Sequence, residues 1–553
     1  MRIIRASVIF VAFVAALLLT GCGETYRPVV IPLPTPGGDP QAQGAVVVGN
    51  QGVHVNHSPI PDGTPCDETN SATVLCPGST TDIDIAGDVN SGNHVVGENP
   101  WTAILSSAGV VYTANRGSNT LSNYSAASSG STTLTVSMPS TVSAKVDTTT
   151  SNTIDVAPVN SIASIVQTLV FATMPACGTL SGTVCTSVDR NRPGVMAFVT
   201  NNTFIQAYQV DKNPVMAVAL PDSSKVYVVN EGSGTVTVFA QLDRTRIANI
   251  AGFASPVYAI ATPDSSFLFV LNRANNTVGV VKTSTDSLIL SASFGATPSP
   301  ASDLPPSHPM FYDARRQRLW VTSSADGTVT VFDTSQLASN STMPVLATVH
   351  VPGAPLAVTV LSDGSRGYVL SGGSSASVSS IDANNFGIST FADYKGAGPR
   401  DIVSSPDGTK VYVVNHDPSV IPSPDPSAPA GSTVIIQQPG TNIITTSTNS
   451  FLKDNNGAPF TIVAPFQDIM NCTIDTPQPW LPDFNYLVNA PMVPRSSNGH
   501  AYRATVAGKS GASDPAFCTT AGCSFTDGGV TWMEIGAPRS CPRQRPSFAT
   551  VPQ

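Results

Sequence analysis

Charged residues are scarce in this chain. Asp, Glu, Lys and Arg make up 11% of its 553 residues, against about 25% in an ordinary soluble domain. The net charge is −9, and no run of Lys or Arg occurs anywhere. A nucleic-acid-binding protein needs a basic face to displace counterions from phosphates. The sequence therefore predicts no nucleic-acid partner.

Recognisable motifs for catalysis and cofactor binding are also missing. The sequence contains no CxxCH for haem, no HExxH for zinc, no GxSxG elbow and no Gly-rich phosphate loop that opens a helix. No CxxC pair exists, and no His lies near the cysteines, so a zinc site is disfavoured. We predict no cofactor and no metal, and we assign no catalytic residue.

Apolar runs long enough to cross a membrane comfortably are absent, but a shorter one stands at the N-terminus. MRIIR is followed by SVIFVAFVAALLL and then by LTGC at Leu19–Cys22, a pattern typical of an export signal. LTGC resembles the bacterial lipoprotein box, which implies a signal peptide over residues 1–22 and a lipid anchor on Cys22. Gly23 follows, so the resemblance implies the outer membrane or the cell surface. The alternative is an ordinary signal peptide with a chance cysteine.

The chain has nine cysteines, one of which is the expected lipidation site Cys22. Removing Cys22 from the nine leaves eight, and an even count in an exported chain indicates disulfides. Nearness in the sequence favours three short loops and one long one, although eight cysteines allow 105 connectivities. The favoured pairs are Cys66–Cys76, Cys177–Cys185, Cys518–Cys523 and Cys472–Cys541.

Proline and glycine are plentiful, with 46 and 43 residues, so the chain turns often and long helices are not expected. Residues 23–43 are rich in both and predict a semi-extended tether. We expect the folded part to begin at residue 44.

The stretch KVYVVNEGSGTVTVFA at 225–240 is one copy of a repeat. A full unit reads as a Pro, an alternating apolar strand, a turn, a second strand closed by Asn or Ser, a Gly-rich turn and a third strand. Six copies keep 14 to 16 residues between the Pro and the closing residue, and a seventh is degenerate. The leading prolines are Pro100, Pro158, Pro214, Pro256, Pro309, Pro355 and Pro399.

Steps of 42 to 58 residues between these prolines suit four-stranded propeller blades. Helical repeats are excluded because the apolar residues alternate. The pattern PDGxxVYVVNxGxGTVxVxD resembles the YVTN family of bacterial β-propeller repeats. That resemblance implies an all-β, seven-bladed propeller of four-stranded antiparallel blades over residues 44–445. We expect residues 80–97 to close the ring by joining the strands at 399–415.

The repeat stops near residue 450, which predicts a small disulfide-containing β module over 446–553. The run YRATxAGxSGxxxPAF…DGGVTW resembles a module appended to bacterial surface and phage tail proteins. It is loosely similar to chitin-binding modules through Tyr502, Phe517 and Trp532, which implies a carbohydrate contact.

Departures from the repeat are the candidate ligand contacts, since loops carry binding function more often than strands. The residue after the closing Asn projects around one rim of a propeller, and the connection before the fifth blade shares that face. The tolerated variation of a surface is the alternative interpretation. The candidates are Arg116, Glu231, Arg273, His308, His416 and Asp417.

Together these features predict a surface-anchored lipoprotein that acts as a binding scaffold for a protein or polysaccharide. One alternative is a hydrolase with its site at the central channel, since propellers of the lactonase type resemble this repeat. A cluster of Arg, His and carboxylate at the channel mouth would favour the enzyme, and a neutral Ser/Thr lining would favour binding. A further alternative is a spacer that presents the C-terminal module.

Overall fold

The computed structural model describes residues 45–54, 77–85, 89–106, 109–126, 132–166, 169–241, 244–296, 307–373, 377–391, 398–415, 432–437, 460–463, 478–486, 490–496, 498–535 and 542–551. This part of the chain is all β apart from the single turn of helix α2 (Leu337–Asn340). No helix in it is long and apolar enough to cross a membrane.

Six of the seven sequence repeats form a four-stranded antiparallel sheet, as predicted, and the second repeat contributes four antiparallel strands to a six-stranded sheet. The first strands are β4 (Pro100–Leu105), β10 (Ser161–Val166), β16 (Pro214–Ala219), β20 (Pro256–Ala261), β24 (Met310–Asp313), β28 (Ala354–Val360) and β32 (Pro399–Ser404). The second strands are β5 (Val110–Asn115), β11 (Leu169–Met174), β17 (Lys225–Asn230), β21 (Phe267–Asn272), β25 (Arg318–Ser323), β29 (Arg366–Gly372) and β33 (Lys410–Asn415).

The outer halves of these sheets hold the remaining two strands of each repeat. The third strands are β6 (Thr120–Ser125), β14 (Pro193–Thr200), β18 (Thr235–Ala240), β22 (Thr277–Lys282), β26 (Thr328–Asp333), β30 (Ser377–Asp382) and β34 (Ser432–Gln437). The fourth strands are β7 (Leu134–Ser137), β15 (Thr203–Lys212), β19 (Arg246–Ala251), β23 (Ser287–Ser293), β27 (Val345–His350), β31 (Ile388–Phe391) and β35 (Phe460–Val463). Second strands such as β17 are buried on both faces, whereas fourth strands such as β19 are largely exposed.

The second repeat is wider than the others. The hairpin of β8 (Thr141–Lys145) and β9 (Ser151–Asp155) extends its sheet to six strands by pairing parallel with β15. The segment between β11 and β14 forms a separate hairpin of β12 (Cys177–Ser181) and β13 (Val184–Val188). The Cys177–Cys185 disulfide crosslinks this hairpin, which confirms that predicted pair.

An eighth sheet is built from the two ends of the chain. It has the order β3-β2-β1-β43, with β1 (Ala45–His54), β2 (Pro77–Asp84), β3 (Val89–Glu98) and β43 (Pro542–Thr550). The expectation that residues 80–97 join the strands at 399–415 is therefore wrong. Those strands already have their own third and fourth partners, β34 and β35. The ring gains one blade beyond the seven repeats.

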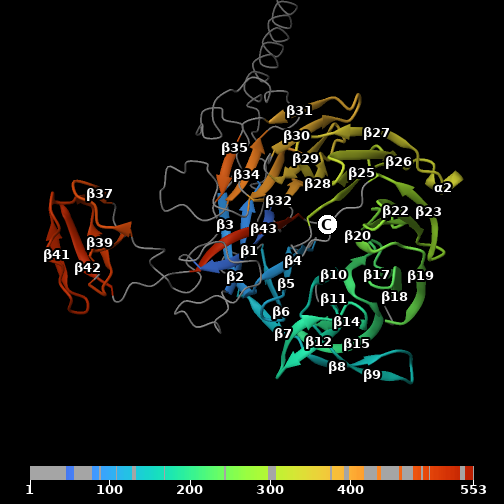
Figure 1. Ribbon diagram of the computed structural model, residues 1–553, viewed down its shortest axis with the longest axis horizontal. Coiled ribbons are helices and arrows are strands. Elements are labelled where there is room, and N and C mark those ends of the chain that lie inside the picture. The colour runs from blue at the N-terminus through green and yellow to red at the C-terminus, as the bar shows by residue number, and fades with distance from the viewer. Residues whose placement is uncertain are drawn as a thin grey trace, which may run out of the picture. The chain divides into compact units, whose positions relative to one another are not determined.

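The eight sheets form a closed ring (Figure 1). Each first strand contacts the first strand of the next sheet, from β4 through β32, and β43 contacts both β32 and β4. A shared apolar core joins the eighth sheet to the seventh, with Val48, Ile83 and Ala549 packed beside Val403 and Tyr412. Sheets packed face to face in this way bury both faces of their inner strands. The expectation of a propeller is confirmed, but the expected count of seven blades is wrong, because the described sheets form a ring of eight.

The closing Asn of the repeat fastens the hairpin between the second and third strands. The Nδ2 atom of Asn230 donates to Thr237 Oγ1 at 2.9 Å, and Asn115 donates in the same way to Ser122 Oγ at 2.9 Å. In the turn that follows, Gly234 has a φ of 64°, a conformation that glycine adopts without steric cost. These contacts give the Asn and the Gly of KVYVVNEGSGTV a structural role.

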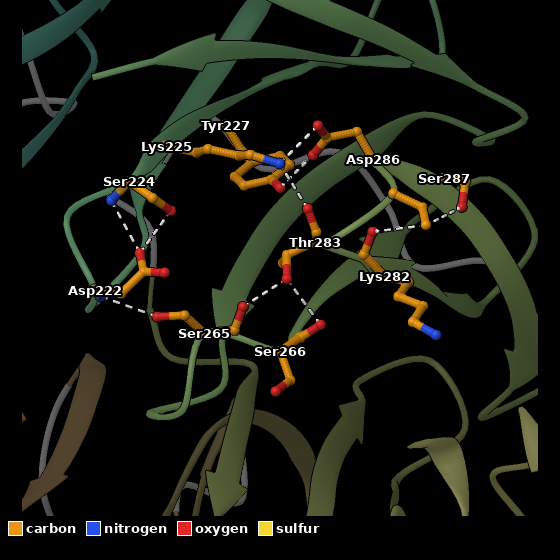
Figure 2. Close-up of polar contacts among 11 residues, drawn as sticks. Asp222, Ser224, Lys225, Tyr227, Ser265, Ser266, Lys282, Thr283, Asp286 and Ser287 are labelled. Atoms are coloured by element: carbon orange, nitrogen blue, oxygen red, sulfur yellow. Dashed lines mark hydrogen bonds and ion pairs between the residues drawn. The ribbon is translucent and has the colours of Figure 1, made fainter. Parts of the chain in front are cut away.

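The first and third residues of KVYVVN have a role that the sequence analysis missed. Figure 2 shows Lys225 and Tyr227 reaching from β17 to the turn after β22 in the next blade. Lys225 Nζ donates to the Thr283 carbonyl at 2.6 Å and pairs with Asp286 at 2.7 Å, and Tyr227 donates to the same carboxylate at 2.7 Å. We call this contact the inter-blade latch.

Two other blades repeat the cationic half of the inter-blade latch. Arg318 donates to the carbonyl of Ala383 in the next blade, and Lys410 donates to the carbonyl of Ile85. The latter pair links the seventh repeat to the eighth sheet, so the same device also closes the ring.

Replacing Lys225 with Met should lower the free energy of unfolding by about 2 kcal/mol, because a charge-assisted hydrogen bond is lost and Asp286 stays largely buried. Urea unfolding followed by fluorescence measures the change. Lys282→Met on the adjacent blade is the matched control, because its ammonium has no hydrogen bond to the described residues. Equal stability of the two variants would contradict a stabilising role for the latch.

The C-terminal module is shorter than expected and lies, along the chain, between two propeller strands. Its strands are β36 (Gln478–Pro479), β37 (Asn485–Tyr486), β38 (Pro491–Val493), β39 (Tyr502–Val506), β40 (Gly508–Lys509), β41 (Ser524–Asp527) and β42 (Val530–Glu534). Residues 460–463 and 542–550, which we expected in the module, are strands of propeller sheets. The predicted Cys518–Cys523 disulfide is present.

Candidate functional site

The candidate rim residues are mostly occupied by contacts within the protein. Glu231 pairs with Arg273 of the next blade and also accepts a hydrogen bond from Asn213 at 2.8 Å. The guanidinium of Arg116 lies 4.3 Å from the centre of the Trp101 ring, a cation–π contact. These three side chains hold neighbouring segments together. Of the six candidates, Glu231 and Arg273 are brought into contact with each other.

His308 is placed differently. It precedes β24, and its Nδ1 atom lies 2.7 Å from Oδ1 of Asp401 on β32, two blades further round the ring. Asp401 is fully buried, whereas about a third of the His308 side chain (36%) is exposed. Tyr258 on β20 meets the imidazole edge to face, with ring centres 6.5 Å apart. A histidine, a carboxylate and a tyrosine from three first strands, or next to them, therefore meet on the inner side of the ring.

Asp401 also fastens the ring. Its Oδ1 accepts hydrogen bonds from the backbone N–H groups of His308 (3.3 Å) and Ile402 (2.9 Å), and its Oδ2 accepts one from Ala549 on β43 (3.0 Å). A buried carboxylate needs such donors because water no longer solvates its charge. One side chain thus connects the fifth repeat, the seventh repeat and the eighth sheet.

The Asp401 carboxylate affects the pKa values of His308 and Tyr258. Burial alone would lower the pKa of His308, but the charge of Asp401 and its hydrogen bond together raise it above the usual value. Burial, and to a smaller extent the charge of Asp401, raises the pKa of Tyr258. His308 therefore stays protonated to a higher pH than a free histidine, and Tyr258 stays neutral.

A cavity of about 200 Å³ lies beside His308. Phe311, Val358, Ile402 and Val551 give it an apolar wall, and Thr359, Ser362, Ser404 and Ser405 contribute hydroxyl groups. Two of these hydroxyls bind each other: Thr359 Oγ1 donates to Ser404 Oγ at 2.9 Å, and Ser404 Oγ donates to the Val360 carbonyl at 3.0 Å. Among the described residues that line the cavity, His308 is the one titratable side chain.

A second histidine–carboxylate pair is closed off from solvent. His94 Nε2 lies 3.2 Å from Asp82, and the Tyr124 hydroxyl donates to the same carboxylate at 2.6 Å. All three side chains are buried, so this group joins the eighth sheet to the first repeat and offers no ligand a surface.

The aromatic residues proposed for carbohydrate contact form the core of the C-terminal module. Tyr502 and Trp532 are fully buried, and Phe517 packs against Tyr502 with ring centres 5.4 Å apart. Asp527 explains the DGGVTW motif, because its Oδ2 accepts hydrogen bonds from the indoles of Trp480 at 2.6 Å and Trp532 at 3.3 Å. The buried rings of Tyr502 and Trp532 cannot stack on a sugar, so the structure does not support a carbohydrate contact at these two residues. The contact at Phe517, which is only partly buried, stays a prediction.

Other candidates lie outside the described residues. They are the lipidation site Cys22, the rim residues His416 and Asp417, and the cysteines Cys66, Cys76, Cys472 and Cys541.

Sequence reasoning missed Asp401 and Tyr258, although the repeat carried a signal for the first. In four other repeats, the residues that align with Asp401 by strand register are Thr102, Met216, Tyr258 and Ala357. A carboxylate is therefore the exception at a position inside the ring, and buried Asp is rare unless it is paired.

Comparison with known proteins identifies no function for the chain. No family model matches the chain, and no curated protein matches it. A protein of unknown function from Desulfotomaculum acetoxidans is 12% identical, with a TM-score of 0.41 over 63% of this chain and 98% of that one. Dihydro-heme d1 dehydrogenase NirN in complex with DHE is 11% identical, with a TM-score of 0.48 over 72% of each chain.

The β-propeller domain of Cps50 (Swd1) from Myceliophteria thermophila is 8% identical, with a TM-score of 0.40 over 57% of this chain and 93% of that one. None of these similarities bears on what this chain binds.

Proposed function

We propose that the protein is a lipid-anchored, YVTN-like propeller of the bacterial cell envelope that binds its ligand at the inner side of the ring, beside His308. The observation that carries this proposal is the cavity next to a half-buried histidine whose ring is fixed by Asp401. Pockets with apolar walls and a few convergent polar groups are the usual form of a binding site.

Export and anchoring are part of the same proposal. Disulfides form in oxidising compartments, and the Cys177–Cys185 and Cys518–Cys523 bonds support a location outside the cytoplasm. The Leu19–Cys22 pattern is the basis for a lipid anchor in the outer membrane or at the cell surface. Labelling cells with a radioactive fatty acid should mark the wild-type protein and leave Cys22→Ser unlabelled.

The binding proposal is tested with glycan and protein arrays probed with the purified protein. We expect the arrays to identify a ligand that the wild-type protein binds. The His308→Gln variant should bind this ligand with an affinity at least 10-fold lower. His350→Gln on the exposed strand β27 is the matched control, because His350 lies outside the cavity. A ligand bound equally by both variants would place the site elsewhere and contradict the proposal.

A hydrolase is the second candidate, and the His308–Asp401 pair is the observation that favours it. A buried carboxylate fixes one imidazole nitrogen, and at a pH above the raised pKa of His308 the other nitrogen can take a proton from water. Assays of lactone hydrolysis with the purified protein distinguish the two functions. Turnover lost in His308→Gln would favour the enzyme, and no turnover in wild type would favour binding.

A further inference from the structure

We propose that the cavity beside His308 takes a small monocarboxylate with an apolar body, such as a short fatty acid or an aromatic acid. This inference rests on the proposed function and names the class of ligand for the same site. The carboxylate would accept a hydrogen bond from His308 Nε2, and the apolar body would lie against Phe311, Val358 and Ile402.

The geometry of His308 fixes which atom faces a ligand. Its Nδ1 atom is held 2.7 Å from Asp401, so Nε2 is the nitrogen that remains for another partner. When the ring is protonated, both nitrogens are donors. Nδ1–H then binds the Asp401 carboxylate and Nε2–H binds a second acceptor. An anionic acceptor makes the stronger, charge-assisted bond.

The rest of the cavity favours a ligand that carries a single negative charge and few other polar groups. The described lining contains no second cation, so a phosphate dianion or a dicarboxylate would leave negative charge without a donor. The hydroxyls of Thr359 and Ser404 are already bonded to protein groups. Ser405 Oγ, which also lines the cavity, donates to Asp407 at 2.5 Å, and Ser362 adds one more hydroxyl. Apart from His308, the other lining residues are apolar and gain by covering the methylene or ring carbons of a ligand.

The volume limits the size of the ligand. Pockets for drug-sized molecules are typically about 300–1,000 Å³, and this cavity measures about 200 Å³. A polysaccharide chain or a folded partner could insert a single group at most. A short acid fits, with its head at His308 and its body toward Val551.

Binding should depend on pH with a defined sign. Two titratable groups meet His308 within the described residues: Asp401 on β32 and Tyr258 on β20. The raised pKa of Tyr258 keeps it neutral, and Asp401 favours the protonated imidazole. Affinity for a carboxylate is therefore present at low pH and is lost as the pH rises through the pKa of His308. Above that pH, the lone pair on Nε2 faces the carboxylate and repels it.

Isothermal titration calorimetry with hexanoate, hexanol and hexylamine tests the inference on the purified protein. We expect hexanoate to bind at pH 6 and to bind at least 10-fold more weakly at pH 9. Hexanol should bind more weakly than hexanoate at pH 6, and hexylamine should not bind. His308→Gln should lower hexanoate affinity at least 10-fold at pH 6, whereas His350→Gln should match wild type.

Failure of this inference is distinguishable from failure of the proposed function. Absence of hexanoate binding at pH 6 by folded wild type, or equal binding by His308→Gln, would overturn the carboxylate assignment. An array ligand that depends on His308 would leave the proposed function standing in that case. Circular dichroism of each variant confirms that it has folded, so a loss of binding reports on the site.

Discussion

Deletion of residues 542–553 is expected to leave a chain that does not fold into a stable ring. Strand β43 pairs with β1 through eight residue pairs and places Ala549 in the core shared by the eighth and seventh sheets. Its loss leaves the edge of β1 without a hydrogen-bonding partner and removes the contact with β32. We expect a destabilisation of about 5 kcal/mol or more, which is comparable with the whole stability of a typical domain.

Soluble expression and urea unfolding measure this effect. The matched control removes residues 478–535, the described C-terminal module, and replaces them with a Gly/Ser linker of similar reach. That variant keeps β43 and should unfold at nearly the same urea concentration as the wild-type propeller. A deletion of everything after residue 450 is a poor test of the module, because it removes propeller strands as well. Normal stability of the 542–553 deletion would contradict ring closure by β43.

Asp401→Ala is expected to lower the free energy of unfolding by about 3–5 kcal/mol, the range for removing one partner of a buried ionic group. The substitution removes the acceptor from the backbone N–H groups of Ile402 and Ala549 and from the His308 ring. Asp514→Ala is the control, because half of that side chain is exposed and its Arg495 partner is 3.9 Å away. It should change stability by less than about 0.5 kcal/mol.

The pH dependence of this effect has a fixed direction. The pKa of His308 is raised in the folded state above its ordinary value of 6.5. The stabilisation from its ion pair is therefore complete below pH 6.5 and is lost as the pH rises through the folded pKa. Unfolding of wild type and Asp401→Ala at pH 5.5 and pH 9 should show the larger difference at pH 5.5. A difference that grows with pH would assign the effect to another group.

The seven repeats could be predicted because each carries several agreeing local signals. A leading Pro, alternating Val and Tyr, a closing Asn and a Gly-rich turn occur together at a constant spacing, and each favours the same hairpin. The two described disulfides followed from the short loops that they close. Such features are local, so one copy of the repeat is enough to define them.

The eighth blade could not be predicted in the same way. Its strands come from opposite ends of the chain, and β43 reads PRQRPSFAT, with two prolines and two arginines instead of alternating apolar residues. The ring supplies the contacts that fix this strand, because β43 pairs with β1 within its own sheet and contacts β32 of the neighbouring sheet. Pairing between such distant segments depends on tertiary context, which overrides β-propensity.

The candidate site was predicted in part for a similar reason. The repeat identified residues that project at one rim, but it did not show that Glu231 and Arg273 meet and satisfy each other. His308 was named from its loop alone. Its fixed orientation depends on Asp401, which lies on a strand two blades away. The burial of Tyr and Trp in the module could not be predicted, because a motif of these residues fits a core as well as a binding face.

Disulfide crosslinking between the two ends of the chain tests the closed eight-sheet ring most directly. Val48 and Ala549 are paired across β1 and β43, and both are buried. Paired residues on antiparallel strands have Cα atoms about 4.5–5.5 Å apart, within the range of a disulfide. The account predicts that the double variant Val48→Cys with Ala549→Cys forms this bond, seen by mass spectrometry of digested protein. It predicts no bond for Thr81→Cys with Val413→Cys, a pair taken from the two segments that the sequence-based closure would join. The opposite result, with the second pair linked and the first pair free, would contradict the eight-sheet ring.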